Sequence, residues 1–356
     1  MGYDAQEVKE ALSIDDIYSI LDSLGGEPEM IDDEYIIART ICHGGDSRKL
    51  YYYANNSMFN CYTSCGSFDI FELIMKIHHL DFNTAINYVV DFFNLGWKLD
   101  TVEVPDNTKD WDTLKRYEKI ADIQIADEQI ILPEISKELL KYYPQPNIAD
   151  WEQEGISKAM MDFYDIKYDP VDQSILIPHT DENNRLIGIR RRTLLPQQEK
   201  FGKYRPAYIN GKLYNHPLGF NLYGLYHAKD NIKKIHKAIV VEGEKSVLKI
   251  GEYLGLQNTI GVAVCGSNLT KYQLQLLIDA GANEIIIAFD ADYEEFGDED
   301  CLKVIEHLQS IHNKYNGYAT ISFMFDNTGE ILSHKMSPVD AGKEAFLQLW
   351  RNRVVL

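Results

Sequence analysis

Hydrophobic positions in the last third of the chain fall into short continuous runs separated by longer segments with helical spacing. KAIVV (237–241) and EIIIAF (284–289) are two of these runs, and the segments that follow them are ten or more residues long. Continuous apolar runs of this length are typical of strands buried on both faces, and such strands with intervening helices form parallel sheets. We therefore expect a compact sheet of βα units over residues 236–356.

The first hundred residues follow a different pattern. Ser13 and Asp16 have capping-box spacing and predict one helix over residues 4–24. Short β-rich runs broken by turn residues at 35–60 predict a small antiparallel ribbon, and two helices with apolar stripes come after it. We group these elements as residues 1–97.

The middle of the chain begins with residues 98–112, which are polar and aperiodic and which we interpret as a linker. Residues 113–235 mix helical patterns with two strand-like runs, SILIPH and LIGIRRRTLL, joined by the turn TDENN. Two such runs around a turn predict a β-hairpin. The predicted fold class is therefore α/β and α+β multidomain, with a mixed α+β core before a βα sheet that has central parallel strands.

Composition limits the classes of function. A chain of 356 residues, 45% hydrophobic and 25% charged, suits two or three globular domains. The formal net charge of −20 argues at first against a polyanionic partner. No apolar run approaches the roughly 18 residues that cross a bilayer, and the first residues lack the features of a signal peptide. We therefore expect a cytoplasmic protein with no membrane partner.

Carboxylates follow two of the expected parallel strands directly. Glu242 comes after KAIVV, and Asp290 and Asp292 come after EIIIAF. The carboxyl ends of parallel strands form the edge at which ligands bind in α/β sheets. Carboxylates without basic partners are costly unless a cation is present, and a hard divalent ion suits them best. The alternative, that each acid is only a helix N-cap, is less favoured because two strands end in the same way.

These segments resemble the Toprim domain, which bacterial primases share with topoisomerases and some nucleases; the resemblance rests on VVEGEKSVL, GVAVCGSNLT and IIIAFDAD. It implies catalysis with two or more Mg²⁺ or Mn²⁺ ions by Glu242, Asp290, Asp292 and Lys245, the lysine either neutralising phosphate or pairing with the acids. KMSPVDAGKEAF is similar to a later acidic segment of primases and implies Asp340 as a further metal ligand. Many bacterial primases carry an aspartate where this chain has Ser246, so a metal contact of that aspartate is either lost here or replaced by Glu244.

Three of the five cysteines lie close together near the N-terminus. Cys42 and His43 are adjacent, and Cys61 and Cys65 form a second pair. Two paired donor sets on either side of a short ribbon suit one tetrahedral zinc ion, whereas the alternative is a group of buried thiols. The segment is similar to the Cys-His-Cys-Cys zinc ribbon of bacterial and phage primases, which implies one structural Zn²⁺. That family usually has CxxH and CxxC pairs, so both spacings differ here.

Basic residues are concentrated between residues 185 and 212. Eight lysines and arginines stand against one acid, Glu199, which gives a local charge of +7. Such a segment with interleaved aromatic residues can bind phosphates and stack bases, although it can also be a solvated face. It resembles the primase core domain that precedes Toprim, which implies nucleic-acid or nucleotide contacts by Arg190, Arg191, Arg192, Lys203, Tyr204 and Arg205.

Together the three resemblances imply a DnaG-like DNA primase. The zinc segment and EGEKS are more similar to primases of phages or mobile elements than to the host replicative enzyme. Such an enzyme would make short RNA primers on a single-stranded DNA template from ribonucleoside triphosphates. Residues 1–97 would be a zinc-ribbon domain with flanking helices, 113–235 the primase core with its basic hairpin, and 236–356 the Toprim catalytic domain with a C-terminal segment.

The sequence has no GxxxxGK[ST] loop, so we expect a separate replicative helicase as partner. Two alternatives stay open at this point. One is a Toprim nuclease. The other is a catalytically weak, primase-derived module that binds single-stranded DNA or recruits a replication partner.

Overall fold

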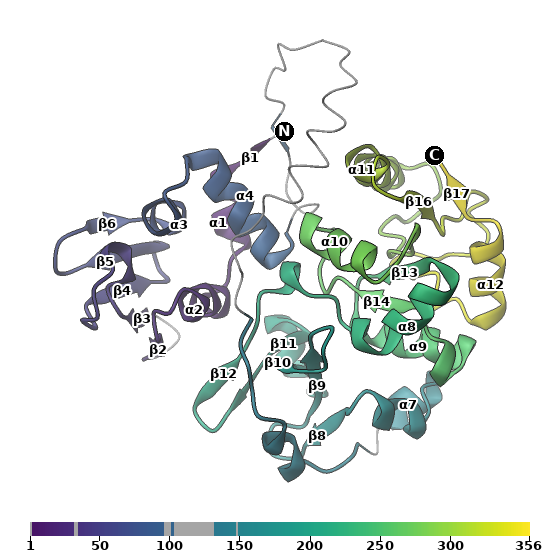
Figure 1. Cartoon of the computed structure of the whole chain (residues 1–356), viewed down its shortest axis with the longest axis horizontal. Helices are drawn as coiled ribbons and strands as arrows, with labels where there is room; N and C mark the ends of the chain where they lie inside the picture. The colour runs from purple at the N-terminus through teal and green to yellow at the C-terminus, as the bar shows by residue number, and fades with distance from the viewer. Residues whose placement is uncertain (1, 32–34, 96–100, 103–131, 147–148) are drawn as a thin grey trace. The chain divides into compact units, whose positions relative to one another are not determined.

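The computed structural model describes residues 2–31, 35–95, 101–102, 132–146 and 149–356 (Figure 1). It contains two compact units. The N-terminal unit holds the elements up to residue 102 together with His216–Leu218, and the C-terminal unit holds most of the described residues from Glu134 onward. The predicted linker, 98–112, lies outside the described residues except for 101–102.

The N-terminal unit is built around a five-stranded antiparallel sheet in the order β2-β3-β4-β5-β6. Burial alternates along its central strands, with Ile36, Leu50 and Phe59 directed inward, as expected for a sheet with one covered face. The predicted ribbon is therefore confirmed. The strands are β2 (Glu29–Met30), β3 (Tyr35–Ala38), β4 (Leu50–Tyr53), β5 (Met58–Cys61) and β6 (Gly66–Phe68).

Four helices accompany this sheet, and a two-stranded pair joins β1 (Gly2–Tyr3) to β7 (Thr101–Val102). The prediction of one helix over 4–24 is wrong, because Ser13 is extended and forms its capping box with Asp16 at the start of a second helix. A capping box satisfies the first free N–H groups of a helix, so it starts a new helix at that point. The helices are α1 (Ala5–Ala11), α2 (Ile14–Ser23), α3 (Ile70–His78) and α4 (Phe82–Phe93).

The first part of the C-terminal unit is an antiparallel sheet in the order β12-β11-β10-β9-β8. Its centre is the predicted hairpin, in which β9 (Ser174–Thr180) pairs with β10 (Leu186–Thr193). The other strands are β8 (Lys167–Asp169), β11 (Tyr204–Ile209) and β12 (Lys212–Tyr214). Short helical segments accompany them, namely η2 (Lys137–Tyr142), α6 (Ala149–Gln153), α7 (Lys158–Phe163), η3 (Pro196–Phe201) and η4 (Leu218–Phe220).

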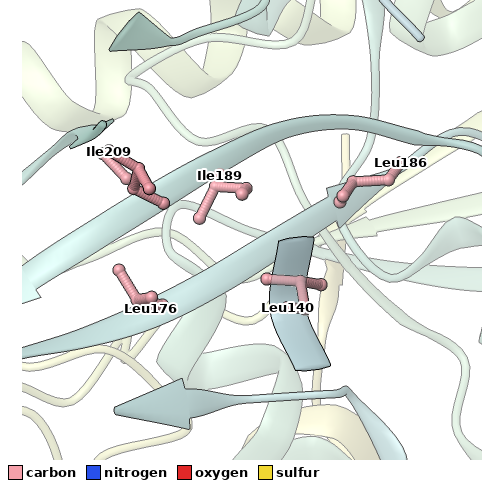
Figure 2. Packing of buried hydrophobic residues seen from close by; sticks show 6 residues of the cluster. Leu140, Leu176, Leu186, Ile189 and Ile209 are labelled. Atoms are coloured by element: carbon pink, nitrogen blue, oxygen red, sulfur yellow. The ribbon is translucent and has the colours of Figure 1, made fainter. Parts of the chain in front are cut away.

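A cluster of buried aliphatic side chains holds this sheet against η2 (Figure 2). Leu176 comes from β9, Leu186 and Ile189 from β10, and Ile209 from β11, while Leu140 comes from η2. Within the region 113–235, for which the sequence predicted helical patterns, η2 is a 3-10 helix. The hairpin is therefore anchored by apolar contacts that leave its later residues, from Arg190 on, available for polar contacts.

The second part of the C-terminal unit is a sheet in the order β14-β13-β15-β16-β17, parallel except for β17. Every residue of β14 and β15 is buried, as the continuous apolar runs predicted. Helices α8 and α9 contact β13 and β14, and α11 contacts β16 (Figure 1). The predicted βα sheet is confirmed.

The strands of this sheet are β13 (Lys237–Val241), β14 (Gly261–Ala263), β15 (Glu284–Ile287), β16 (Thr320–Phe323) and β17 (Val354–Val355). The helical segments are α8 (Leu225–Ile235), α9 (Glu244–Leu254), η5 (Leu256–Asn258), α10 (Lys271–Asp279), α11 (Glu299–Tyr315) and α12 (Lys343–Arg351). Within the described part of the chain, none of the helices has both the length and the apolar character that a bilayer crossing requires.

Candidate metal centres and nucleic-acid interface

The acids that follow β13 and β15 meet at one edge of the parallel sheet. The two strands are hydrogen-bonded neighbours in parallel register, so their carboxyl ends lie side by side. The backbone N–H of Asp290 donates to Oε1 of Glu242 over 3.0 Å. A bridge between Ala291 and Met336 brings the segment that leads to Asp340 against the same turn. The structure thus assembles an edge of carboxylates from three separate segments.

The electrostatics of this edge differ from residue to residue. Burial raises the pKa of Asp290, and the nearby charges of Asp340 and Asp292 raise it further, to about 7. Burial would also raise the pKa of Asp340. Nζ of Lys249 at 2.6 Å and the Lys245 charge instead hold this pKa below its usual range. The ionised form of Asp290 is therefore disfavoured in the metal-free protein, although the Lys245 charge acts in the opposite direction.

Lys245 lies beside the acids at the start of α9. Its Nζ is 2.6 Å from Glu154 and 3.9 Å from Asp340. Lys245 was expected either to neutralise phosphate or to pair with acids, and the structure contains the pairing with acids. Its contact with phosphate stays a prediction. Ser246, where many primases have an aspartate, is buried and contributes no carboxylate to the edge. Glu154 and Lys249 had no signal in the sequence, because each joins this group only through the packing of α6 and α9.

The donor set suits hard divalent ions. Among the described residues, no three of these carboxylates bring oxygens within 4.8 Å of one another, in contrast to the cysteine cluster below. Mg²⁺ and Mn²⁺ sites commonly use one or two carboxylates, water and substrate phosphate rather than a closed protein cage. An open edge that includes Asp290 fits this kind of binding.

Metal binding at this edge should depend on pH because of Asp290. A pKa of about 7 means that the metal-free protein holds a proton there at pH 6, and a metal ion must displace it. We expect the affinity for Mn²⁺ to rise by up to about tenfold between pH 6 and pH 7 and to level off above pH 8. Titration calorimetry in buffers of different ionisation enthalpy measures the released proton. An affinity that is independent of pH, or the same pH dependence in Asp290→Asn, would contradict this expectation.

The second candidate centre lies in the N-terminal unit. One donor atom each from Cys42, His43, Cys61 and Cys65 lies within 4.8 Å of the other three. Cys42 and His43 sit on the 3-10 turn η1 (Ile41–His43), and the other two cysteines lie at the end of β5 and in the turn after it. Donors bound to one zinc ion at about 2.3 Å lie roughly 4 Å apart, so all four residues fit one ion.

Adjacent donors can share this site because the backbone turns sharply at them. The side chain of Cys42 is buried, whereas His43 is exposed and its Nε2 lies 2.9 Å from Oγ1 of Thr63. Gly44 follows with a φ of 71°, in the left-handed region that glycine adopts readily. The 3-10 turn brings the adjacent side chains of Cys42 and His43 to the same site. Adjacent donors can therefore take the place of the usual CxxH pair.

The thiols of this cluster already differ in acidity. Burial would raise the pKa of Cys61, but backbone N–H groups of Ser64, Cys65 and Thr63 and the Thr63 hydroxyl lower it to about 5. Burial and the neighbouring cysteines raise the pKa of Cys42 well above its usual range. A turn whose N–H groups stabilise one thiolate is prepared for a metal, because zinc binds the thiolate form.

The basic hairpin is less free than its charge of +7 implied. Nε of Arg185 is 2.6 Å from Asp181, Nη1 of Arg190 is 3.0 Å from the buried Glu244, and Arg191 pairs with Asp172. Three of its arginines are thus neutralised within the protein. Contacts of Arg190 and Arg191 with nucleic acid stay a prediction.

The remaining candidates lie where the hairpin meets β11. Lys203 is exposed, and a shallow hollow is lined by Arg191, Thr193, Gln198, Gly202, Lys203 and Arg205. The ring of Tyr204 lies 5.9 Å from the guanidinium carbon of Arg190, and burial raises the pKa of Tyr204 well above its usual range. Arg192 pairs in register with Tyr204 across the two strands. Contacts of Arg192, Lys203, Tyr204 and Arg205 with nucleic acid or nucleotide stay a prediction.

Sequence reasoning missed a buried group beside these residues. Donor atoms of His179, Glu244 and Cys265 lie within 4.8 Å of one another in the C-terminal unit. The only sequence signal was a second glutamate in EGEKS, and an acid at the start of a helix is common without a special role. Glu244 is buried because β9, β10 and α9 pack together, and the sequence does not reveal this packing.

A comparison with protein families identifies one domain of the chain. The Toprim domain family model matches residues 237–328, which span β13 to β16, so the C-terminal unit contains a Toprim domain. The class of protein is thus one with a Toprim domain and a Cys₃His cluster in the same chain.

The relatives identify the family more closely. The chain is 36% identical to the SPbeta prophage-derived uncharacterized protein YorJ of Bacillus subtilis, over 99% of this chain and 98% of that protein. It therefore belongs to the family of that prophage protein.

A primase relative matches over a shorter stretch. The chain is 34% identical to the DNA primase of Synechocystis over 156 residues, which are 43% of this chain and 22% of the primase. The match therefore spans about a fifth of that relative's length. Among solved structures, the zinc-binding and RNA polymerase domains of the Aquifex aeolicus primase are similar with a TM-score of 0.47 and 17% identity. That alignment covers 100% of this chain and 87% of the other.

Proposed function

We propose that this protein is a DNA primase that synthesises short RNA primers on a single-stranded DNA template by two-metal nucleotidyl transfer. The observation that carries the proposal is the edge of the parallel sheet at which carboxylates from separate segments meet, namely Glu242, Asp290, Asp292 and Asp340. The Cys₃His cluster in the same chain supports a primase over a Toprim nuclease, for which such a cluster has no evident use.

The residues of the edge would have different roles in catalysis. Glu242, Asp290, Asp292 and Asp340 would hold two or more Mg²⁺ or Mn²⁺ ions, which supply charge neutralisation at the reacting phosphate when bound. Lys245 would balance the charge of the triphosphate as its pairing with Glu154 loosens. The 3′-hydroxyl of the growing primer would attack the α-phosphate and pyrophosphate would leave, so no side chain acts as nucleophile.

The other parts of the chain would position the substrates. Lys203, Arg205 and the arginines of the hairpin would hold the template and the incoming ribonucleotide, with Tyr204 beside them. The zinc-bound ribbon, with one structural Zn²⁺, would help to choose the start site. The domain boundaries 1–97, 98–112, 113–235 and 236–356, a phage or mobile-element origin, a cytoplasmic location and a separate helicase belong to the same proposal.

Primer synthesis by the purified chain tests this function. The protein is incubated with single-stranded DNA, labelled ribonucleoside triphosphates and Mg²⁺ or Mn²⁺, and products are separated on a denaturing gel. We expect oligoribonucleotides that disappear when the metal is chelated. Shortened DNA without RNA products would instead identify a nuclease, and DNA binding without either product under both metals would identify a binding module; each outcome overturns the proposal.

A further inference from the structure

A buried group of charged side chains includes Glu244, which follows Glu242 of the acidic edge by two residues. The side chain of Glu244 is 2% exposed, that of His179 is 1% exposed and that of Arg190 is 14% exposed. Oε1 of Glu244 is 3.0 Å from Nη1 of Arg190 and 3.1 Å from Nε2 of His179. The three residues come from α9, β10 and β9, so the group ties the parallel sheet to the antiparallel hairpin within the C-terminal unit.

Both members of the ion pair are charged in spite of their burial. Burial would raise the pKa of Glu244, but the Arg190 charge and the His179 hydrogen bond lower it to about 2. Burial would lower the pKa of Arg190, and Glu244 raises it. A buried ion pair seldom stabilises a fold more than apolar residues of the same size would, so its presence points to a role in fixing geometry.

A second metal site is the obvious alternative, since His179, Glu244 and Cys265 are all metal-ligand types. The guanidinium of Arg190 argues against it. Its Nη1 lies 3.0 Å from Oε1 of Glu244, and its positive charge there opposes the binding of a cation by the same carboxylate. The carboxylate is therefore already neutralised by the protein.

The location of the pair connects it with both functional parts of the unit. Glu244 follows Glu242 after a single glycine, so the position of one carboxylate restricts the other. Glu242 in turn accepts the N–H of Asp290. On the other side, Arg190 donates to the carbonyl of Tyr204 over 3.4 Å and lies in β10 just before Arg191.

We propose that Glu244 and Arg190 are positioning residues whose ion pair holds the metal-binding turn at Glu242 in a fixed relation to the basic hairpin. The inference rests on the proposed function and adds to it the contact that aligns bound metal ions with the template and nucleotide. Residues that orient metal ligands typically change metal affinity or activity by about 10- to 100-fold when they are replaced.

Mn²⁺ binding and primer synthesis in matched variants test this role. Glu244→Gln and Arg190→Met should each weaken Mn²⁺ binding by about tenfold and lower kcat by at least as much, with a smaller change in KM for nucleotide. The double variant should lose about as much as either single one, because both remove the same interaction. Arg190→Lys keeps the charge without the planar fork and should recover part of the affinity.

Glu284→Gln is the matched control. Glu284 is also buried and ion-paired, with Nη2 of Arg353 at 3.0 Å, but it lies at the start of β15, at the end of that strand away from Asp290. We expect this variant to melt at a lower temperature and to bind Mn²⁺ like wild type. An unchanged Mn²⁺ affinity in both Glu244→Gln and Arg190→Met, or an equal loss in Glu284→Gln, would overturn the inference. A second zinc ion per chain that is lost in Cys265→Ser would do so as well.

The binding measurement also separates this inference from the proposed function. Mn²⁺ affinity is followed by electron paramagnetic resonance of the free ion, without DNA or nucleotide. A wild-type protein that binds Mn²⁺ but makes no primer would overturn the proposed function, and the affinities of the variants would still decide the role of the ion pair.

Discussion

Asp290→Asn is expected to reduce primer synthesis by more than about 100-fold, because it removes the carboxylate charge at the centre of the acidic edge. The same change should make the metal-free protein more stable above pH 7. Burial and the charges of Asp340 and Asp292 raise the pKa of Asp290 to about 7, so its ionised form disfavours the folded state and a neutral amide relieves that cost. Activity and metal-free stability should therefore change in opposite directions.

Thermal unfolding with and without Mn²⁺ checks both parts of this prediction. Wild type should gain stability from Mn²⁺, because a ligand that binds only the folded state raises the melting temperature. Asp290→Asn should melt higher than wild type without metal and gain much less when Mn²⁺ is added. Asp279→Asn, at the exposed end of α10, is the control and should behave like wild type in every assay. A fully active Asp290→Asn variant would remove this residue from the catalytic site.

Cys61→Ser is expected to abolish zinc binding and to destabilise the N-terminal unit. Cys61 is the thiol that backbone N–H groups prepare as a thiolate, with a pKa of about 5, and its Sγ lies 3.0 Å from Oγ1 of Thr63. Serine has no comparable affinity for zinc, and the free energy of structural zinc binding contributes directly to folding. Elemental analysis should give one zinc ion per wild-type chain and none in the variant.

Limited proteolysis locates the loss of stability. In Cys61→Ser the first cleavages should fall within residues 2–95, while fragments from the C-terminal unit persist. Cys301→Ala is the matched control, because Cys301 is fully buried in α11, outside the cluster of four donors. It should retain zinc. One zinc ion still bound to Cys61→Ser would show that the four donors do not act together.

Several parts of the structure could be predicted from local patterns because they depend on neighbouring residues alone. After their first residues, the runs KAIVV and EIIIAF are apolar, as is typical of strands buried on both faces, and both form parallel strands. Glu242 and Asp290 could be placed at one edge because the carboxyl ends of parallel strands meet at the same edge of a sheet. The prediction failed at residues 4–24, where the helical spacing continues through Ser13 although the capping box starts a second helix there.

The sequence by itself determined that an antiparallel ribbon precedes the parallel βα sheet, that acids follow the strand ends and that two donor pairs form the cysteine cluster, since each is a short-range pattern. Only the tertiary structure decided how charges from distant segments are paired. The net charge of −20 and the +7 of the hairpin did not reveal that Arg190 is neutralised by Glu244, 54 residues away, while Asp290 is left beside Asp340. Burial changes the free energy of a charge far more than sequence neighbours do, and burial is set by packing.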